Sequence, residues 1–524
     1  MKRSLFATAR FVIASKIEPM QIHWRLVKNA VANLGRGSAA ATVALLLPPV
    51  LVRRMTPASY AVWVLVLQTA AYVGYLNFGL QTAIGRYVAY ANEKQNVEQR
   101  DSVFSTAFVG LCCSALVSLI CLAAATLAAP AIFPSVPSPL IPQMRLALLL
   151  VGFSIAVELP ASACNGVFVG MERYEIPALT VGGARLFSAL GVIAAALAGR
   201  SLVAMAAIIA AANLLSCLAQ YLALRRIAPD VRFQLSLVRR STARELSGYC
   251  FGLTVMSVSM LLVTGFDLVL VGHFEFAVVT PYSVAASMIT LLSGLLFAII
   301  NVIMPHAATL HAREKAEAMG RLVITSTRLN VLLLVLTGIP MFIYVGPLIH
   351  LWIGQRYVAS GAPLLAILIV ANIIRLIGAP YSVIIVAAGQ QNYIKVSPLS
   401  EGASNFVASM VLGSVFGGIG VALGTLFGSI VSVASHLWYS MPRTNPVINF
   451  SRRDFVVSGV LSPLLWTSPL LATAAASWCG IVIRPFVFAA AGLLSAMGAG
   501  LLIFRTEGLF RERFNPSGHQ GEVC

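Results

Sequence analysis

Six ionisable residues lie inside long apolar runs of the sequence: Arg36, Glu158, Arg185, Asp267, Arg375 and Glu401. Each costs roughly 2.5 to 3.5 kcal/mol at the centre of a membrane-spanning helix, so these side chains are expected to face a cavity or one another rather than lipid. A guanidinium stays protonated and binds phosphate through a two-pronged fork of N–H groups. Arg36, Arg185 and Arg375 therefore predict a cationic cavity that suits a pyrophosphate head group.

The acids suggest a second kind of chemistry. Asp267, in the run TGFDLVLVG, and Glu158 are candidates for ion coupling, because a buried carboxylate can take up a proton or bind a cation. Structural roles stay open beside these functional ones. Glu158 can pair with Arg185 between consecutive helices, Asp267 can act as a cap, and Arg36 and Glu401 can reach the inner interface of the membrane.

The composition indicates what kind of secondary structure carries these charged residues. The chain has 524 residues, of which 59% are hydrophobic and 10% charged, with a mean hydropathy of +0.87. Soluble domains carry about 25% charged residues, which excludes that class. The apolar runs are long enough for helical spans of about 20 residues and do not show the alternation of a membrane barrel. The sequence predicts an all-α integral membrane protein.

About fourteen spans are expected, arranged as two six-helix bundles related by a pseudo-two-fold axis along the membrane normal, plus two C-terminal helices. The stretch Pro48 to Asp101 has a basic turn, an uncharged run and a solvated loop beginning near Arg86, and a weaker copy runs from Val271 to Arg321. Parallel repeats of this kind favour a substrate site between the halves. The predicted parts are a cytoplasmic amphipathic segment (1–30), two bundles (31–227 and 250–440), a basic cytoplasmic linker (228–249), two additional helices (455–504) and a cytoplasmic tail (505–524).

The positive charges predict the orientation. The formal net charge is +18, and three quarters of the 36 Lys and Arg residues fall in segments that are cytoplasmic if the N terminus is inside. This bias predicts two cytoplasmic termini in a bacterial inner membrane, with basic loops against anionic inner-leaflet lipid. It also explains the charge without nucleic-acid binding. The outer connections hold only Arg53, Arg54, Arg145, Arg200, Arg356 and Arg484.

Motifs for catalysis are missing from the sequence. We find no nucleotide-binding loop, no paired carboxylates at a workable spacing and no metal-ligand cluster, so no catalytic residue, metal or cofactor is predicted. The cysteines read as small core residues. The sequence does not read as that of an enzyme.

Several motifs together resemble bacterial polysaccharide-export flippases of the O-antigen (Wzx) type, in the multidrug/oligosaccharidyl-lipid/polysaccharide exporter superfamily. They are FGLQTAIGRYVAYANEK (Phe78 to Lys94), GVFVGMERYEIPA (Gly166 to Ala178), FDLVLVGHF with TPYSVA, and PHAATLHARE (Pro305 to Glu314). The resemblance implies a fourteen-helix transporter that carries undecaprenyl-pyrophosphate-linked repeat units to the outer leaflet. It also points to Arg86 and Asp267 as family-like positions.

Two other functions compete with a flippase. A multidrug/cation antiporter of the same superfamily would favour an acidic cavity, whereas arginine predominates here. A membrane-bound polymerase or glycosyltransferase would be expected to carry catalytic residues on a large outer loop, but the longest outer loop, Pro130 to Gln143, is uncharged. For a flippase, the expected partners are a lipid-linked oligosaccharide and a polysaccharide polymerase, a chain-length regulator and glycosyltransferases.

Overall fold

In the part of the chain that the structure describes, all regular secondary structure is helical. The computed structural model describes residues 46–480, 486–495, 497, 498 and 500. The chain divides into two compact units, residues 1–257 and residues 258–524. The boundary between them lies inside α9 (Arg240–Met260). Each unit is therefore described by itself.

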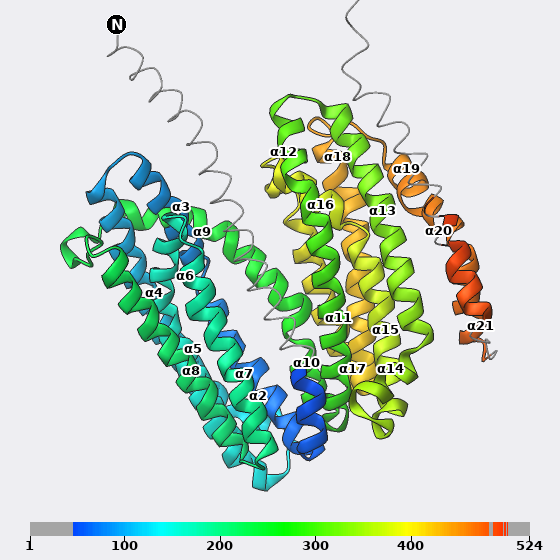
Figure 1. Cartoon of the computed structure of the whole chain (residues 1–524), viewed down its shortest axis with the longest axis horizontal. Helices are drawn as coiled ribbons and strands as arrows, with labels where there is room; N and C mark the ends of the chain where they lie inside the picture. Colours follow the sequence, from blue (N-terminus) through cyan, green and yellow to red (C-terminus); the bar gives the residue numbers. More distant parts are fainter. Residues whose placement is uncertain (1–45, 481–485, 496, 499, 501–524) are drawn as a thin grey trace, which may run out of the picture. The chain divides into compact units, whose positions relative to one another are not determined.

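The first unit is built around α5, which contacts α2, α3, α4 and α8 (Figure 1). Its described helices, besides residues 46–54 and short turns, are α2 (Pro57–Tyr75), α3 (Leu80–Glu93), α4 (Val97–Ile132), α5 (Ile141–Gly170), α6 (Glu175–Pro177), α7 (Gly183–Leu197), α8 (Leu202–Ile227) and the first part of α9. Many of these helices expose apolar side chains, such as Leu127 on α4 and Leu190 on α7. Apolar surface of this kind is what a helix in contact with lipid presents.

Helices α3 and α5 approach closely through glycine. A Cβ atom at Gly166 would lie 2.6 Å from Cβ of Ile84, and one at Gly170 would lie 2.8 Å from the carbonyl oxygen of Gly85. Small residues at such contacts let membrane helices pack backbone to backbone. Helix α3 packs against α5 in this way and continues past Arg86 to Glu93. The prediction that a loop begins near Arg86 was therefore wrong.

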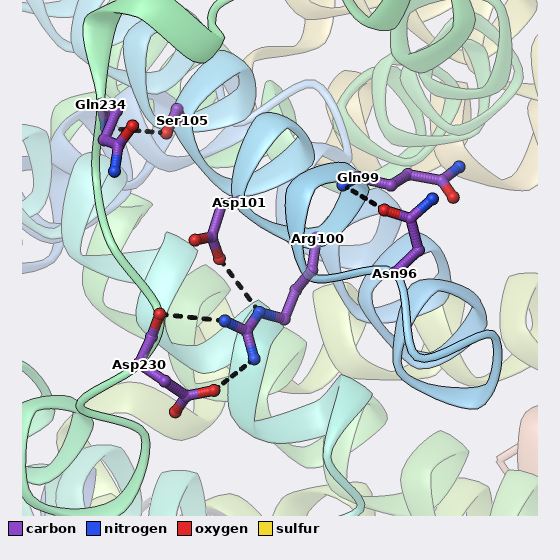
Figure 2. Close-up of polar contacts among 7 residues, drawn as sticks. All are labelled: Asn96, Gln99, Arg100, Asp101, Ser105, Asp230 and Gln234. Atoms are coloured by element: carbon purple, nitrogen blue, oxygen red, sulfur yellow. Dashed lines mark hydrogen bonds and ion pairs between the residues drawn. The ribbon is translucent and has the colours of Figure 1, made fainter.

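The linker after α8 is fastened to α4. Figure 2 shows Arg100 between two carboxylates: its Nη1 donates to Asp230 Oδ2 at 2.6 Å, its Nη2 to the Asp230 carbonyl at 2.9 Å, and its Nε to Asp101 Oδ1 at 3.0 Å. Further along, the backbone N–H of Gln234 donates to Ser105 Oγ at 3.1 Å, and Arg239 pairs with Glu98. The basic linker predicted over 228–249 is thus ordered along α4 until α9 begins at Arg240.

The hydrogen bond that Arg100 donates lowers the pKa of the Asp230 carboxyl below its ordinary value of 3.8. A carboxyl with a depressed pKa in the folded protein stabilises the fold above its unfolded pKa and loses that contribution as the pH falls through the folded value. The contact between the linker and α4 is therefore complete at neutral pH. It weakens only below about pH 3.8.

Replacing Arg100 with Ala should loosen the linker. The change removes three hydrogen bonds and leaves the buried Asp101 carboxylate without its cation, which is costly in a desolvated place. We expect trypsin to cleave the purified protein at Arg232 at least about tenfold faster, because cleavage requires local opening. Arg226→Ala, which removes an exposed cation at the end of α8, is the control. Equal cleavage rates in both variants would contradict the role of Arg100.

The second unit contains the remaining helices. After the π-helical turn Leu261–Gly265 come α10 (Asp267–Phe274), α11 (Val279–Ile300), α12 (Met304–Ala312), α13 (Ala316–Ile343), α14 (Val345–Ile353), α15 (Val358–Leu376), α16 (Ala379–Ala387), α17 (Val396–Ser435), α18 (Met441–Thr444), α19 (Arg452–Asp454), α20 (Ser462–Trp466) and α21 (Ser468–Trp478). Helix α15 contacts α11, α13 and α17, which Figure 1 shows running beside one another. A buried cluster that includes Tyr381, Ile384 and Phe455 adds a hydrophobic core.

Helix α17 is a hairpin of two antiparallel arms. The helical backbone is interrupted at Gly417, which has φ +58° and ψ −136°. Glycine adopts this conformation without steric cost, because it has no Cβ atom. Contacts pair the arms in register: Ser397 Oγ lies 3.1 Å from Ser432 Oγ, and a Cβ atom at Gly424 would lie 2.2 Å from Ser409 Oγ. The two predicted spans 396–417 and 419–440 correspond to these arms.

The chain is a multi-pass membrane protein. The described residues include ten helical segments that are long and apolar enough to cross a membrane, or eleven if the bent pair Arg452–Trp466 and Ser468–Ser477 is one span. One of the ten, Gln391–Thr444, contains the α17 hairpin. The predicted total of fourteen stays a prediction, because the spans expected over 31–52 and 479–504 include residues outside the described part.

Candidate functional site

The second unit holds a buried carboxylate at the start of α10. Asp267 is 7% exposed and follows the π-helical turn Leu261–Gly265. Such π turns occur often at functional sites, because they shift the helix face that follows. The turn directs Asp267 toward the α17 hairpin.

Both arms of the hairpin donate to this carboxylate. Asn405 Nδ2, on the first arm, donates to Asp267 Oδ1 at 3.1 Å, and Thr425 Oγ1, on the second arm, donates to Oδ2 at 3.0 Å. All three side chains are buried. Hydrogen bonds to an ionised carboxylate are among the stronger ones in proteins, so this contact ties α10 to both arms at one point.

Further hydrogen bonds hold Asn405 in place beside the carboxylate. Asn405 Nδ2 also lies 2.8 Å from the carbonyl oxygen of Val263, and Ser409 Oγ donates to Asn405 Oδ1 at 2.9 Å and lies 3.2 Å from the carbonyl oxygen of Val421. The buried hydroxyl of Tyr282 is close to Asp267, without a hydrogen bond of good geometry. A carboxylate is the kind of ligand that hard cations prefer, and a buried carboxylate can also bind a proton. The arrangement can hold a cation or take up a proton.

Arg375 lies in the same unit, in the last turn of α15. The side chain is half-buried, and Nη2 donates to Asn372 Oδ1 at 3.0 Å. Ser293 Oγ, from α11, donates to the same oxygen at 2.7 Å. The guanidinium is near enough to Asp267 and Glu401 for an electrostatic interaction, yet forms no ion pair with a described residue within 4.0 Å. Most of its five N–H donors are thus open to another acceptor.

The remaining predicted site residues lie in the first unit. Glu158 on α5 interacts electrostatically with Arg185 on α7, but the two do not approach within 4.0 Å, and Arg185 is exposed. Arg86 is also exposed, and its guanidinium lies over the rings of Tyr249 at 4.7 Å and Tyr87 at 5.8 Å. Arg36 lies outside the described residues. The role of the three arginines in substrate binding and that of Glu158 in ion coupling stay predictions.

Sequence reasoning missed Asn405 and Thr425. An asparagine in the middle of an apolar run is costly in lipid, so Asn405 was a signal that could have been read beside the charged residues. Thr425 gives no such signal, because a threonine in a helix can satisfy its hydroxyl locally, as its 3.2 Å contact to the Val421 carbonyl shows. Only the fold brings Thr425 to Asp267.

Comparison with known families gives one match. The model of the family described as "Polysaccharide biosynthesis protein" matches residues 26–311. No curated protein matches the chain.

Solved structures with the same fold are transporters. "Lipid II flippase MurJ, inward closed conformation" superposes with a TM-score of 0.66 at 13% identity, over 93% of this chain and 99% of the other. A "multidrug resistance MATE family transporter of the MOP superfamily", inward-facing, gives 0.65 at 13% identity, over 78% and 95%. A MATE protein in the straight conformation gives 0.51 at 14% identity, over 81% and 96%. The chain shares the fold of these structures.

Proposed function

Because the chain belongs to the polysaccharide biosynthesis protein family, we propose that it is a flippase for undecaprenyl-pyrophosphate-linked oligosaccharide repeat units. It carries them from the cytoplasmic to the periplasmic leaflet by alternating access. The family match and the fold that it shares with a lipid II flippase support a lipid-linked substrate. The Wzx-like motifs in the sequence support an O-antigen or exopolysaccharide unit as its sugar part.

One observation carries the choice of an anionic substrate. Arg375 keeps a fixed positive charge inside an apolar helix, where it contacts the amide of Asn372 rather than a carboxylate. A permanent charge at such a place is costly, and since Asp267 and Glu401 interact with it without forming an ion pair, most of its N–H groups can bind an anionic ligand. A pyrophosphate fits, because its oxygens accept from a guanidinium in pairs. Arg36, Arg185 and Arg86 are proposed to act on the same head group.

Asp267 is proposed to couple transport to an ion gradient. Its carboxylate joins α10 to both arms of the α17 hairpin, so protonation or cation binding there changes the contacts among three helical segments. An ion that binds one arrangement more tightly shifts the population toward it. Glu158, half-buried on α5 of the first unit, is the second candidate for this role.

The substrate is tested by what accumulates in cells that lack the protein. A flippase defect should leave lipid-linked repeat units on the cytoplasmic leaflet and stop surface polymer, while a plasmid copy restores both. Loss of polymer with repeat units already on the periplasmic leaflet would instead indicate a polymerase or glycosyltransferase. Unchanged polymer with greater drug sensitivity would indicate the multidrug/cation antiporter. A gene neighbourhood with glycosyltransferases, a polymerase and a chain-length regulator would favour the flippase.

The proposed orientation puts both termini and the 228–239 linker in the cytoplasm of a bacterium. A single cysteine at Ser236, in a chain otherwise free of cysteine, should react with an impermeant maleimide only after the inner membrane is opened. A cysteine at Ser138, in the connection between α4 and α5, should react in intact spheroplasts. The reverse pattern would invert the topology and with it the direction of transport.

A further inference from the structure

Helix α10 is bordered by two acids that both contact the α17 hairpin. Asp267 begins the helix and contacts Asn405 and Thr425, one on each arm. Glu275 follows its last residue, and its Oε2 accepts a hydrogen bond of 2.8 Å from the backbone N–H of Gly418. Since α10 has eight residues, the two contacts are about 12 Å apart along its axis. The hairpin is held at its turn and again near the middle of its arms.

The contact at the turn is specific in two ways. Gly418 opens the second arm, where backbone N–H groups have no partner within the helix and an acid is favoured. A Cβ atom at the preceding Gly417 would lie 2.2 Å from Glu275 Oε2, so only glycine permits this approach. The same glycine has the positive φ that reverses the chain. The carboxylate therefore fits one conformation of the turn.

The position of the turn decides which residues of the two arms face each other. Gly424 packs on Ser409 and Gly428 on Asn405, with backbone contacts too close for any larger residue. A shift of one residue in either arm would break these contacts and turn Asn405 or Thr425 away from Asp267, because successive residues of a helix differ in direction by about 100°. The site at Asp267 thus depends on the register that the turn sets.

We propose that Glu275 is a positioning residue that fixes the register of the α17 hairpin, so that Asn405 and Thr425 converge on Asp267. This inference rests on the proposed role of Asp267 in ion coupling and adds the residue that assembles the site. Glu275 does not touch the ion. It acts through the turn at Gly417 and Gly418.

Register is measured with a cysteine pair across the arms. Ser397 and Ser432, whose hydroxyl oxygens are 3.1 Å apart, are replaced by cysteine in a full-length chain otherwise free of cysteine, and copper phenanthroline drives disulfide formation. We expect Glu275→Ala to slow this reaction about tenfold, the effect of losing a charge-assisted hydrogen bond. Glu275→Gln keeps an oxygen acceptor of the same length and loses only the charge, so its rate should lie between those of Glu275→Ala and the parent.

Two further variants separate positioning from general damage. Glu275→Asp keeps the charge but is one methylene too short to reach Gly418, so it should react as slowly as Glu275→Ala, and it serves if the alanine variant does not accumulate. Glu317→Ala removes an exposed acid from α13 and should leave the rate unchanged. Parent-like rates in both the Ala and Asp variants would overturn the proposal.

Ion binding is measured on the same proteins without the cysteine pair. Sodium ions should raise the apparent Tm of the purified parent, and Glu275→Ala should need about tenfold more sodium for half of the effect, with Glu275→Gln between the two. If Glu275→Ala crosslinks slowly but the Tm of the parent does not respond to sodium or pH, the positioning role of Glu275 stands and ion coupling at Asp267 is rejected. A sodium response that is equal in Glu275→Ala and the parent would overturn the positioning of the site.

Discussion

Replacing Arg375 with Ala is expected to abolish surface-polysaccharide assembly while the protein stays at normal levels in the membrane. The guanidinium makes one hydrogen bond, to Asn372, and forms no ion pair with a described residue within 4.0 Å, so its removal should cost less folding energy than the loss of a direct ion pair. A pyrophosphate in apolar surroundings, however, loses a charge partner that water cannot replace. A loss of about 3 kcal/mol, typical for one partner of a desolvated charge pair, lowers transport more than a hundredfold. Polymer at the cell surface and the membrane level of the protein are measured together.

Arg375→Lys and Arg321→Ala complete this experiment. Lysine retains the charge without the fork and should restore transport only in part, which would separate charge from bidentate geometry. Arg321 is an exposed cation on α13 that pairs with Glu317, and its loss should have no effect. Normal polymer in Arg375→Ala would remove this residue from the site.

Asp267→Asn is expected to remove the dependence of transport on the ion gradient. The amide has nearly the same shape and can still accept from one neighbour, but it has no charge to hold a cation and no proton to exchange. It also directs an N–H₂ group at a neighbour that itself donates, either Asn405 Nδ2 or Thr425 Oγ1. Transport of a lipid-linked substrate into vesicles, with and without an imposed sodium or proton gradient, measures the effect.

A matched change of an exposed acid controls for the loss of charge. Glu317→Gln, on the surface of α13, should behave like the parent protein at every gradient. Thr425→Val, which removes one hydroxyl from the Asp267 carboxylate, should weaken the dependence without abolishing it, by about the worth of one hydrogen bond to a charged group. If Asp267→Asn responds to the gradients like the parent, coupling lies elsewhere, and Glu158 becomes the candidate.

Hydropathy alone was enough to predict a helical multi-pass membrane protein, because a backbone in lipid must satisfy its own hydrogen bonds. It also singled out Asp267 and Arg375, since each is a rare charge in an apolar run. The extent of individual helices was harder to predict. Arg86 and Glu93 read as the start of a loop, yet α3 continues through them, because Ala83, Ile84 and Val88 on its other face are buried.

The sequence by itself determined the class of the protein and which of its charges lie in apolar runs, since both can be read from the order of polar and apolar side chains. The partners of those charges were decided only by the tertiary structure. Asn405 and Thr425 are 138 and 158 residues from Asp267 along the chain, and they meet it because Gly417 turns α17 back on itself and Glu275 contacts that turn. Local sequence preferences do not encode contacts between residues so far apart in the chain. Helix packing sets these contacts, through the close approach of backbones at glycine residues and through the register of the two arms.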